Sequence, residues 1–153
     1  MAAERFMVIP AAYVYLIRGR QVLLQQRQNT GYLGGAWVAG AAGHIELGET
    51  AAETAAREAA EEIGIVIETA DLQPATVMQR TDGSAVQLEQ RVDWFFTAHT
   101  WQGEPTIREP RKCADLRWFS LDALPSEMPS YERLVLDAIA GDSVSAFTSF
   151  GFA

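Results

Sequence analysis

The residues from Gly43 to Ile65 constrain the fold of this 153-residue chain more than any other part of its sequence. They read GHIELGETAAETAAREAAEEIGI, a glycine-containing loop followed by an alanine-rich run. Thr50 and Glu53 have the spacing of a capping box, which predicts that a helix begins there, and the alanine and glutamate residues favour its continuation. Gly64 is typical of a helix C-terminus. The pattern therefore predicts a loop that leads directly into a helix.

Three glutamates of this predicted helix are spaced to share one face. Glu58, Glu61 and Glu62 lie three and four positions apart, and such positions are neighbours on a helix surface. Carboxylate oxygens are ligands that Mg²⁺ and Mn²⁺ prefer, together with water and phosphate oxygens. A charge run by itself usually marks a solvated face, but the preceding loop and the register of the surrounding residues favour a metal site.

The register is specific enough to indicate a family. Gly43, Glu49, the run from Arg57 to Glu62, and Gly64 with Ile65 together resemble the signature of the MutT/Nudix hydrolases. The resemblance implies an α/β/α sandwich with a mixed β-sheet, and it extends over most of the chain. With no linker or repeat in the sequence, we expect a single domain over residues 1–153.

The resemblance also assigns roles to individual residues. It implies that Glu58, Glu61 and Glu62 bind Mg²⁺ or Mn²⁺, with Glu62 as the principal ligand. Arg57 and Glu49 match the pair that orients these carboxylates across the loop. The carbonyl of Ala42, which precedes the first glycine of the signature, is expected to complete a metal's coordination.

A general base is also needed, because the family reaction is attack of water on a phosphorus atom. Glu58 is one candidate within the signature. In MutT-like members a Gly-Glu-Pro turn precedes a loop glutamate and then a Trp-Phe strand, and Gly103 to Pro105 with Trp118 and Phe119 resembles that arrangement. Glu109 matches the loop glutamate best, and Glu104 is the second choice.

The remaining secondary structure follows from apolar patterns. We expect a hairpin from Val8–Ile17 and Gln21–Gln26, a loop from Asn29 to Gly43, and a second helix over Ser130–Ala140. Further strands are expected at residues 65–68, 76–80, 92–99 and 116–119. Alternation along the strand at 92–99 should place Trp94 and Phe96 on one face and Phe95 on the other.

Composition limits the partners. The formal net charge of −8 argues against a duplex nucleic-acid binder, which needs a basic surface. The apolar run from Phe6 to Ile17 is too short to span a bilayer, and the flanks do not fit a signal peptide. The chain has one cysteine, so no intrachain disulfide forms and a cytoplasmic setting fits best. The family resemblance is compatible with a homodimer.

The substrate is inferred only by elimination. The expected reaction converts a nucleoside triphosphate into a nucleoside monophosphate and pyrophosphate, and includes sanitation of oxidised nucleotides. An ADP-ribose or nucleotide-sugar pyrophosphatase is an alternative, although the proline of the ADP-ribose subfamilies is absent near Arg80. A non-catalytic nucleotide-binding module is another, against which the three glutamates count. An isomerase would need a cysteine in a suitable motif, and Cys113 has no evident catalytic partner.

One segment departs from the family pattern. Many members have a proline three residues after the tryptophan of this loop, followed by two small residues, whereas this chain reads Trp37-Val38-Ala39-Gly40-Ala41-Ala42-Gly43. We expect the altered loop to reshape the pocket beside the metal site. The role of Ala42 depends on this loop more than the roles of the glutamates do.

Overall fold

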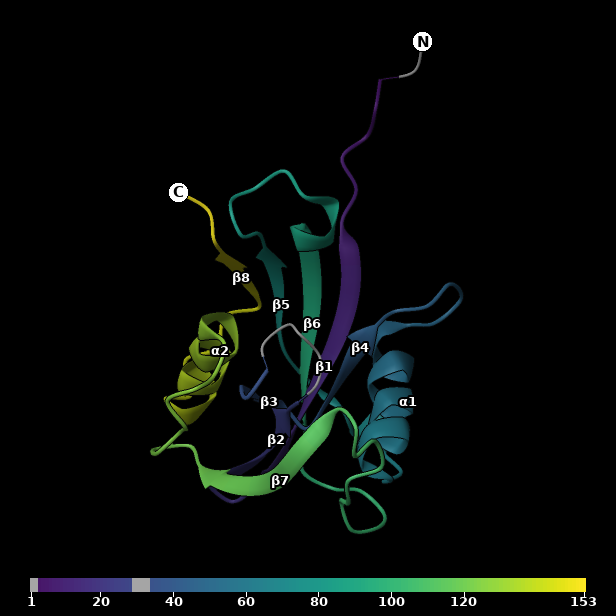
Figure 1. Cartoon of the computed structure of the whole chain (residues 1–153), viewed down its shortest axis with the longest axis vertical. Coiled ribbons are helices and arrows are strands. Elements are labelled where there is room, and N and C mark those ends of the chain that lie inside the picture. Colours follow the sequence, from purple (N-terminus) through teal and green to yellow (C-terminus); the bar gives the residue numbers. More distant parts are fainter. Residues whose placement is uncertain (1–2, 29–33) are drawn as a thin grey trace.

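A mixed β-sheet forms the centre of the computed structural model, which describes residues 3–28 and 34–153 (Figure 1). Within these ranges the sheet has eight strands, in the order β3-β2-β1-β6-β5-β8, with β4 paired to β1 and β7 paired to β2. Its strands are β1 (Ile9–Arg18), β2 (Gln21–Arg27), β3 (Trp37–Ala39), β4 (Ala41–His44), β5 (Gln73–Arg80), β6 (Arg91–Ala98), β7 (Cys113–Ser120) and β8 (Phe147–Phe150).

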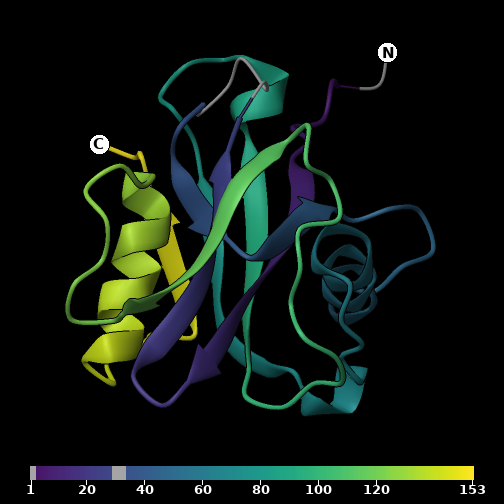
Figure 2. The same ribbon diagram turned by 60° about the horizontal axis from the view of Figure 1, so that its bottom comes forward.

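Strand β1 organises the sheet because it pairs on both edges. On one edge it runs parallel to β6 from Ile9 to Leu16. On the other edge it pairs first with β4, over Ala11–Val14, and then with β2, at Ile17 and Arg18. The sheet therefore forks along this second edge. One arm contains β4, and the other contains β2, β3 and β7, as the turned view in Figure 2 shows.

Two helices cover opposite faces of the sheet, α1 (Ala51–Ile63) and α2 (Ser130–Ala140) (Figure 1). Alternate residues of β1 contribute to two cores. Val14 and Leu16 pack in the core under α1, whereas Tyr13 and Tyr15 pack in the core under α2. The predicted α/β/α sandwich with a mixed sheet is confirmed.

Helix α1 begins and ends as its sequence predicts. Thr50 Oγ1 accepts a hydrogen bond from the Glu53 amide at 3.1 Å, and the Glu53 side chain accepts one from the Thr50 amide, which completes the capping box. Gly64 has a φ of 69°, in the left-handed region, and its amide donates to the Ala60 carbonyl. Short 3₁₀ turns follow at η1 (Thr69–Asp71) and η2 (Gln87–Glu89).

Other expectations from the sequence were met. The hairpin of β1 and β2 turns through Gly19, which has a φ of 61°. In β6, Phe95 packs in the core under α2, and Trp94 and Phe96 pack in the core under α1. No helix among the described residues has the length and apolar character needed to cross a membrane.

Two expectations were wrong, and one strand was missed. The expected strand at residues 65–68 is a single bridge between Val66 and Gln102, because no second strand runs beside it. The expected loop from residue 29 to residue 43 contains β3 and most of β4, which are too short and glycine-rich to show a periodic pattern, and its residues 29–33 lie outside the described ranges. Strand β8 was also missed, since it is a four-residue edge strand held only by β5.

Candidate functional site

Arg57 is the centre of an ion-pair network at the start of α1. Its Nε and Nη2 donate to the two carboxylate oxygens of Glu49 at 2.7 and 3.0 Å, a bidentate arrangement. Its Nη1 donates to Glu58 Oε1 at 2.9 Å and approaches Glu61 Oε2 at 3.3 Å. These hydrogen bonds lower the pKa of Glu49 to about 2, chiefly through Arg57. The predicted pairing of Arg57 with Glu49 is present in the structure.

Glu58 packs directly against the backbone of the loop that precedes α1. A Cβ atom added at Gly43 would collide with the Glu58 carboxylate, so a larger residue at this position would push the Glu58 side chain out of its observed place. The Glu58 side chain is 15% exposed, and burial raises its pKa above the usual value although Arg57 opposes the shift. Gly43 therefore allows the helix carboxylate and the loop backbone to come together.

Glu62 faces the same loop from the next turn of the helix. Its Oε2 accepts a hydrogen bond from the amide of Ala42 at 2.8 Å. Burial raises the pKa of Glu62 to about 8, and the nearby charges of Glu58 and Glu109 act in the same direction. Such a carboxyl group is electrostatically destabilised as an anion, and a bound cation would relieve that cost.

Glu61 is less closely associated with the other two glutamates. Its side chain is 54% exposed and contacts Arg57. No group of three or more His, Cys, Asp or Glu side chains is arranged to hold a metal ion within residues 3–28 and 34–153. Arg57 contacts Glu58 and Glu61, whereas the Ala42 amide contacts Glu62, and the assignment of all three glutamates as metal ligands stays a prediction.

The two downstream glutamates lie in different places. Glu109 contributes to the raised pKa values of both Glu58 and Glu62, so its charge lies close to the helix carboxylates. Its side chain forms an ion pair with Lys112 at 3.2 Å. Glu104 instead lines a separate hollow beside Arg18. Of the two glutamates, Glu109 is thus the one whose charge acts on the helix carboxylates, and its role as a base stays a prediction.

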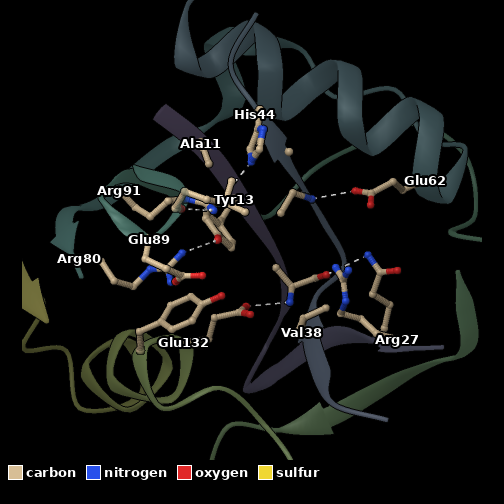
Figure 3. A pocket seen from close by; sticks show the side chains of 16 residues that line it. Ala11, Tyr13, Arg27, Val38, His44, Glu62, Arg80, Glu89, Arg91 and Glu132 are labelled. Carbon is tan, nitrogen blue, oxygen red and sulfur yellow. Dashed lines mark hydrogen bonds between the residues drawn. The ribbon is translucent and has the colours of Figure 1, made fainter. Parts of the chain in front are cut away.

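A cavity of about 400 Å³ opens beside Glu62, at the fork of the sheet. Figure 3 shows Glu62 on one side of this cavity and Glu132, from α2, on the other. Both arms of the sheet, the η2 segment and α2 contribute to its wall, which consists of Ala11, Tyr13, Gln25, Arg27, Val38, Ala39, Ala42, Gly43, His44, Glu62, Arg80, Leu88, Glu89, Arg91, Tyr131 and Glu132. Its volume lies within the range of small-molecule sites.

Cationic side chains line this cavity although the chain is acidic overall. Arg27, Arg80 and Arg91 contribute to the wall, together with His44. Arg91 Nη2 lies 3.3 Å from His44 Nε2, and burial and Arg91 together lower the pKa of His44. The Nε atoms of Arg27 and Arg91 are buried without a hydrogen-bond partner among the described residues. An anionic ligand would supply acceptors for these groups.

The loop without the family's proline is held by side chains from other elements. Gln25 Nε2 donates to the carbonyls of Ala39 and Gly40 at 3.2 and 3.0 Å. The Ala39 amide donates to Glu132 Oε1 at 2.8 Å. Together with the hydrogen bond from Ala42 to Glu62, these contacts fix the segment by its backbone groups, where a proline would have fixed it by its ring.

Several residues of the cavity could not be identified from local motifs. Arg80 and Asp93 form a buried ion pair at 2.8 Å across two strands, which no short motif signals. Glu132 is fully buried although it is a charged residue of an amphipathic helix. A signal was present, because Glu132 falls within the stripe of Tyr131, Val135 and Leu136 that faces the core.

Comparison with known proteins gives consistent results. The model of the NUDIX domain matches residues 7–138. An isopentenyl-diphosphate Delta-isomerase from Rhodobacter capsulatus is 34% identical over 120 residues, which cover 77% of this chain and 67% of that protein.

Solved structures show the same fold. A MutT NUDIX hydrolase from Burkholderia pseudomallei has a TM-score of 0.76 and 27% identity, with 86% of this chain and 97% of that chain covered. A mutator MutT protein from Bacillus halodurans has a TM-score of 0.74 at 21% identity, with 94% and 90% covered.

Proposed function

Since this chain belongs to the NUDIX family, we propose that it is a divalent-metal-dependent hydrolase that cleaves a nucleoside triphosphate into a nucleoside monophosphate and pyrophosphate. The observation that carries the proposal is the position of Glu62. Its carboxylate lies at the wall of a 400 Å³ cavity that is also lined by arginines, with Glu58 and Glu109 close enough to raise its pKa. The proposed metal ligand Glu62 and arginines that could bind phosphate thus line the same cavity.

The residues present fit a hard divalent cation. The donors are carboxylate oxygens of Glu58, Glu61 and Glu62 and the carbonyl oxygen of Ala42, which suit Mg²⁺ or Mn²⁺. Gly43 leaves the close space between loop and helix that such a site needs. When bound, the cation would offset phosphate charge and acidify the attacking water.

The protein's own groups would position the reactants. Arg57 holds Glu58 while Glu49 holds Arg57, so the direction of the Glu58 carboxylate is set before substrate binds. Arg27 and Arg91 line the cavity, and their positive charges would attract the phosphate oxygens. Glu109 would accept the proton of the attacking water, with Glu58 as the alternative base.

A substrate panel tests this function. Purified protein with Mg²⁺ is incubated with nucleoside triphosphates, oxidised nucleotides, ADP-ribose and nucleotide sugars, and the products are identified by chromatography. We expect turnover of a triphosphate, and a loss of at least about 100-fold in kcat/KM in the Glu62→Gln variant. Unchanged turnover in that variant would exclude Glu62 as a metal ligand, and binding without turnover at any metal concentration would indicate a non-catalytic module.

An isomerase is the second candidate, because the curated relative from Rhodobacter capsulatus carries that name at 34% identity. The chain's one cysteine does not support it. Cys113 is 6% exposed, its thiol donates to the carbonyl of Asp115, and burial raises the pKa of the thiol. Such a thiol is a poor acid–base group. Incubation with isopentenyl diphosphate in deuterated water should give neither the double-bond isomer nor deuterium incorporation by NMR.

A further inference from the structure

Glu132 presents an unpaired oxygen at the end of the cavity away from Glu62 (Figure 3). Its Oε1 accepts two hydrogen bonds, from the Tyr15 hydroxyl at 2.8 Å and from the Ala39 amide at 2.8 Å. Its Oε2 is buried and has no hydrogen-bond partner in the described part of the chain. The carboxylate is therefore held in a fixed direction by one oxygen, and the other oxygen lies unpaired behind the cavity wall.

A buried carboxylate oxygen without a donor is unfavourable, so its persistence in a cavity wall needs an explanation. The nearest cation does not supply one. Arg80 donates to Asp93 Oδ2 at 2.8 Å and to the Tyr13 hydroxyl at 3.4 Å, and its guanidinium lies 3.8 Å from the centre of the Tyr131 ring. These contacts direct Arg80 towards Asp93, Tyr13 and Tyr131, and no described residue donates a hydrogen bond to Glu132 Oε2.

The surroundings of Oε2 indicate the shape of the ligand. Tyr13, Val38, Leu88 and Tyr131 give the cavity wall apolar and aromatic surface. A group with apolar faces and a polar edge suits such a wall, whereas a sugar carries hydroxyls in every direction. A plain hydrocarbon group would leave Oε2 unpaired. These conditions favour a nucleobase.

We propose that Glu132 determines substrate specificity by accepting, through Oε2, a hydrogen bond from an exocyclic amino group of the nucleobase. This inference rests on the proposed function, because it places the diphosphate at Glu62 and the base at Glu132. An amino group projects beyond the ring, so it reaches an oxygen that is recessed behind the wall. Glu132 is fully buried, and the base edge must therefore displace the side chains that cover it.

The Glu132→Gln variant replaces the hydrogen-bond acceptor Oε2 by a donor and keeps the shape of the side chain. The amide carbonyl oxygen replaces Oε1 as acceptor for Tyr15 and Ala39, and the NH₂ group replaces Oε2 with a donor. The matched control is Asp137→Asn, which removes an exposed carboxylate from the same helix. The control is expected to leave binding unchanged.

The test compares non-hydrolysable α,β-methylene triphosphates in pairs that differ by one amino group: adenosine and purine riboside, guanosine and inosine, cytidine and 2-pyrimidinone riboside. Dissociation constants are measured calorimetrically with Mg²⁺ at about pH 8.5, where Glu132 is ionised, since burial raises its pKa to about 7. In the wild type we expect at least one amino-bearing analogue to bind about tenfold or more tightly than its partner. In Glu132→Gln that difference should disappear.

The proposal is overturned if the wild type distinguishes no pair, binds no analogue, or shows a preference that Glu132→Gln retains. If the variant does not fold, the wild-type measurement can still overturn the proposal, because a wild type that distinguishes no pair excludes it. Hydrolysis is followed separately with ordinary triphosphates. Discrimination in binding without hydrolysis would contradict the proposed reaction and leave Glu132 as a specificity residue, whereas hydrolysis without discrimination would contradict only the role of Glu132.

Discussion

Arg57 shows how one side chain can set the geometry of several others. It contacts Glu49 with two N–H groups and Glu58 with a third, and Glu49 also accepts hydrogen bonds from Thr54 and from the Glu46 amide. The planar guanidinium is needed for this arrangement, because an ammonium group cannot form the bidentate contact. The planar geometry of the Arg57 guanidinium therefore matters more for orienting Glu49 and Glu58 than its positive charge alone.

The Arg57→Lys variant should bind Mn²⁺ about 10–100-fold more weakly than the wild type, because the charge is kept but Glu58 is no longer oriented. Calorimetric titration with Mn²⁺ measures the change. Arg20→Lys is the matched control, since Arg20 forms a similar fork with Asp122 on the exposed surface at 2.7 and 3.1 Å. Equal Mn²⁺ affinity in Arg57→Lys and the wild type would contradict the orienting role.

Gly43→Ala tests the close approach between loop and helix. The added methyl group must displace the Glu58 carboxylate, so we expect an approximately 10–100-fold loss of Mn²⁺ affinity. Gly34→Ala serves as the control, because a Cβ at Gly34 meets no atom within 4 Å. If both variants bound Mn²⁺ like the wild type, Glu58 would not need its observed position.

At the scale of the elements, the sequence predicted long periodic segments better than short ones. The α1 and α2 helices and the first hairpin were expected from capping residues, apolar spacing and a glycine turn. Strands β3, β4 and β8 were missed because partners distant in sequence stabilise them, and their own residues show weak preferences. The signature glutamates were predicted because they lie close together in sequence, whereas the cavity wall was not, because its residues come from segments that are distant in sequence.

The cap of α1 gives a prediction at this scale. Thr50→Ala removes the hydroxyl that accepts from the Glu53 amide, so the free energy of unfolding should fall by about 1 kcal/mol. Urea denaturation followed by circular dichroism measures the change. Thr50→Ser keeps the acceptor and should retain most of the stability. An equal loss in both variants would show that the threonine methyl group, and not the capping bond, is responsible.

At the scale of the whole molecule, two carboxyl groups on opposite sides of the cavity, the partly buried Glu62 and the fully buried Glu132, make stability depend on pH. Burial raises the pKa of Glu62 to about 8 and that of Glu132 to about 7, from an ordinary value near 4.5. Between the ordinary pKa near 4.5 and the raised pKa of each group, the folded state keeps a proton that the unfolded chain releases. The stabilisation is complete below about pH 4.5 and is lost as the pH rises through the folded pKa values.

We therefore expect the metal-free protein to become less stable from pH 5 to pH 8, with each group contributing roughly 3 kcal/mol or less. Urea denaturation in the presence of a chelator measures this trend. In Glu132→Gln the free energy of unfolding should fall less between pH 5 and pH 8, because one titrating group is removed. Added Mn²⁺ should restore stability most at pH 8, because the cation binds the ionised carboxylates. Stability that rises over this range in the chelator would contradict the buried positions of these groups.

The parallel pairing of β1 with β6 also affects how the chain reaches its native state. Ile9 pairs with Arg91, 82 residues later, and these strands form the middle of the sheet. Contacts of such long range slow folding, because a large loop must close before they form. During synthesis on the ribosome, the apolar strand IPAAYVYLI at residues 9–17 stays without its parallel partner until β6 has emerged. We therefore expect this strand to promote aggregation of the nascent chain until β6 has emerged.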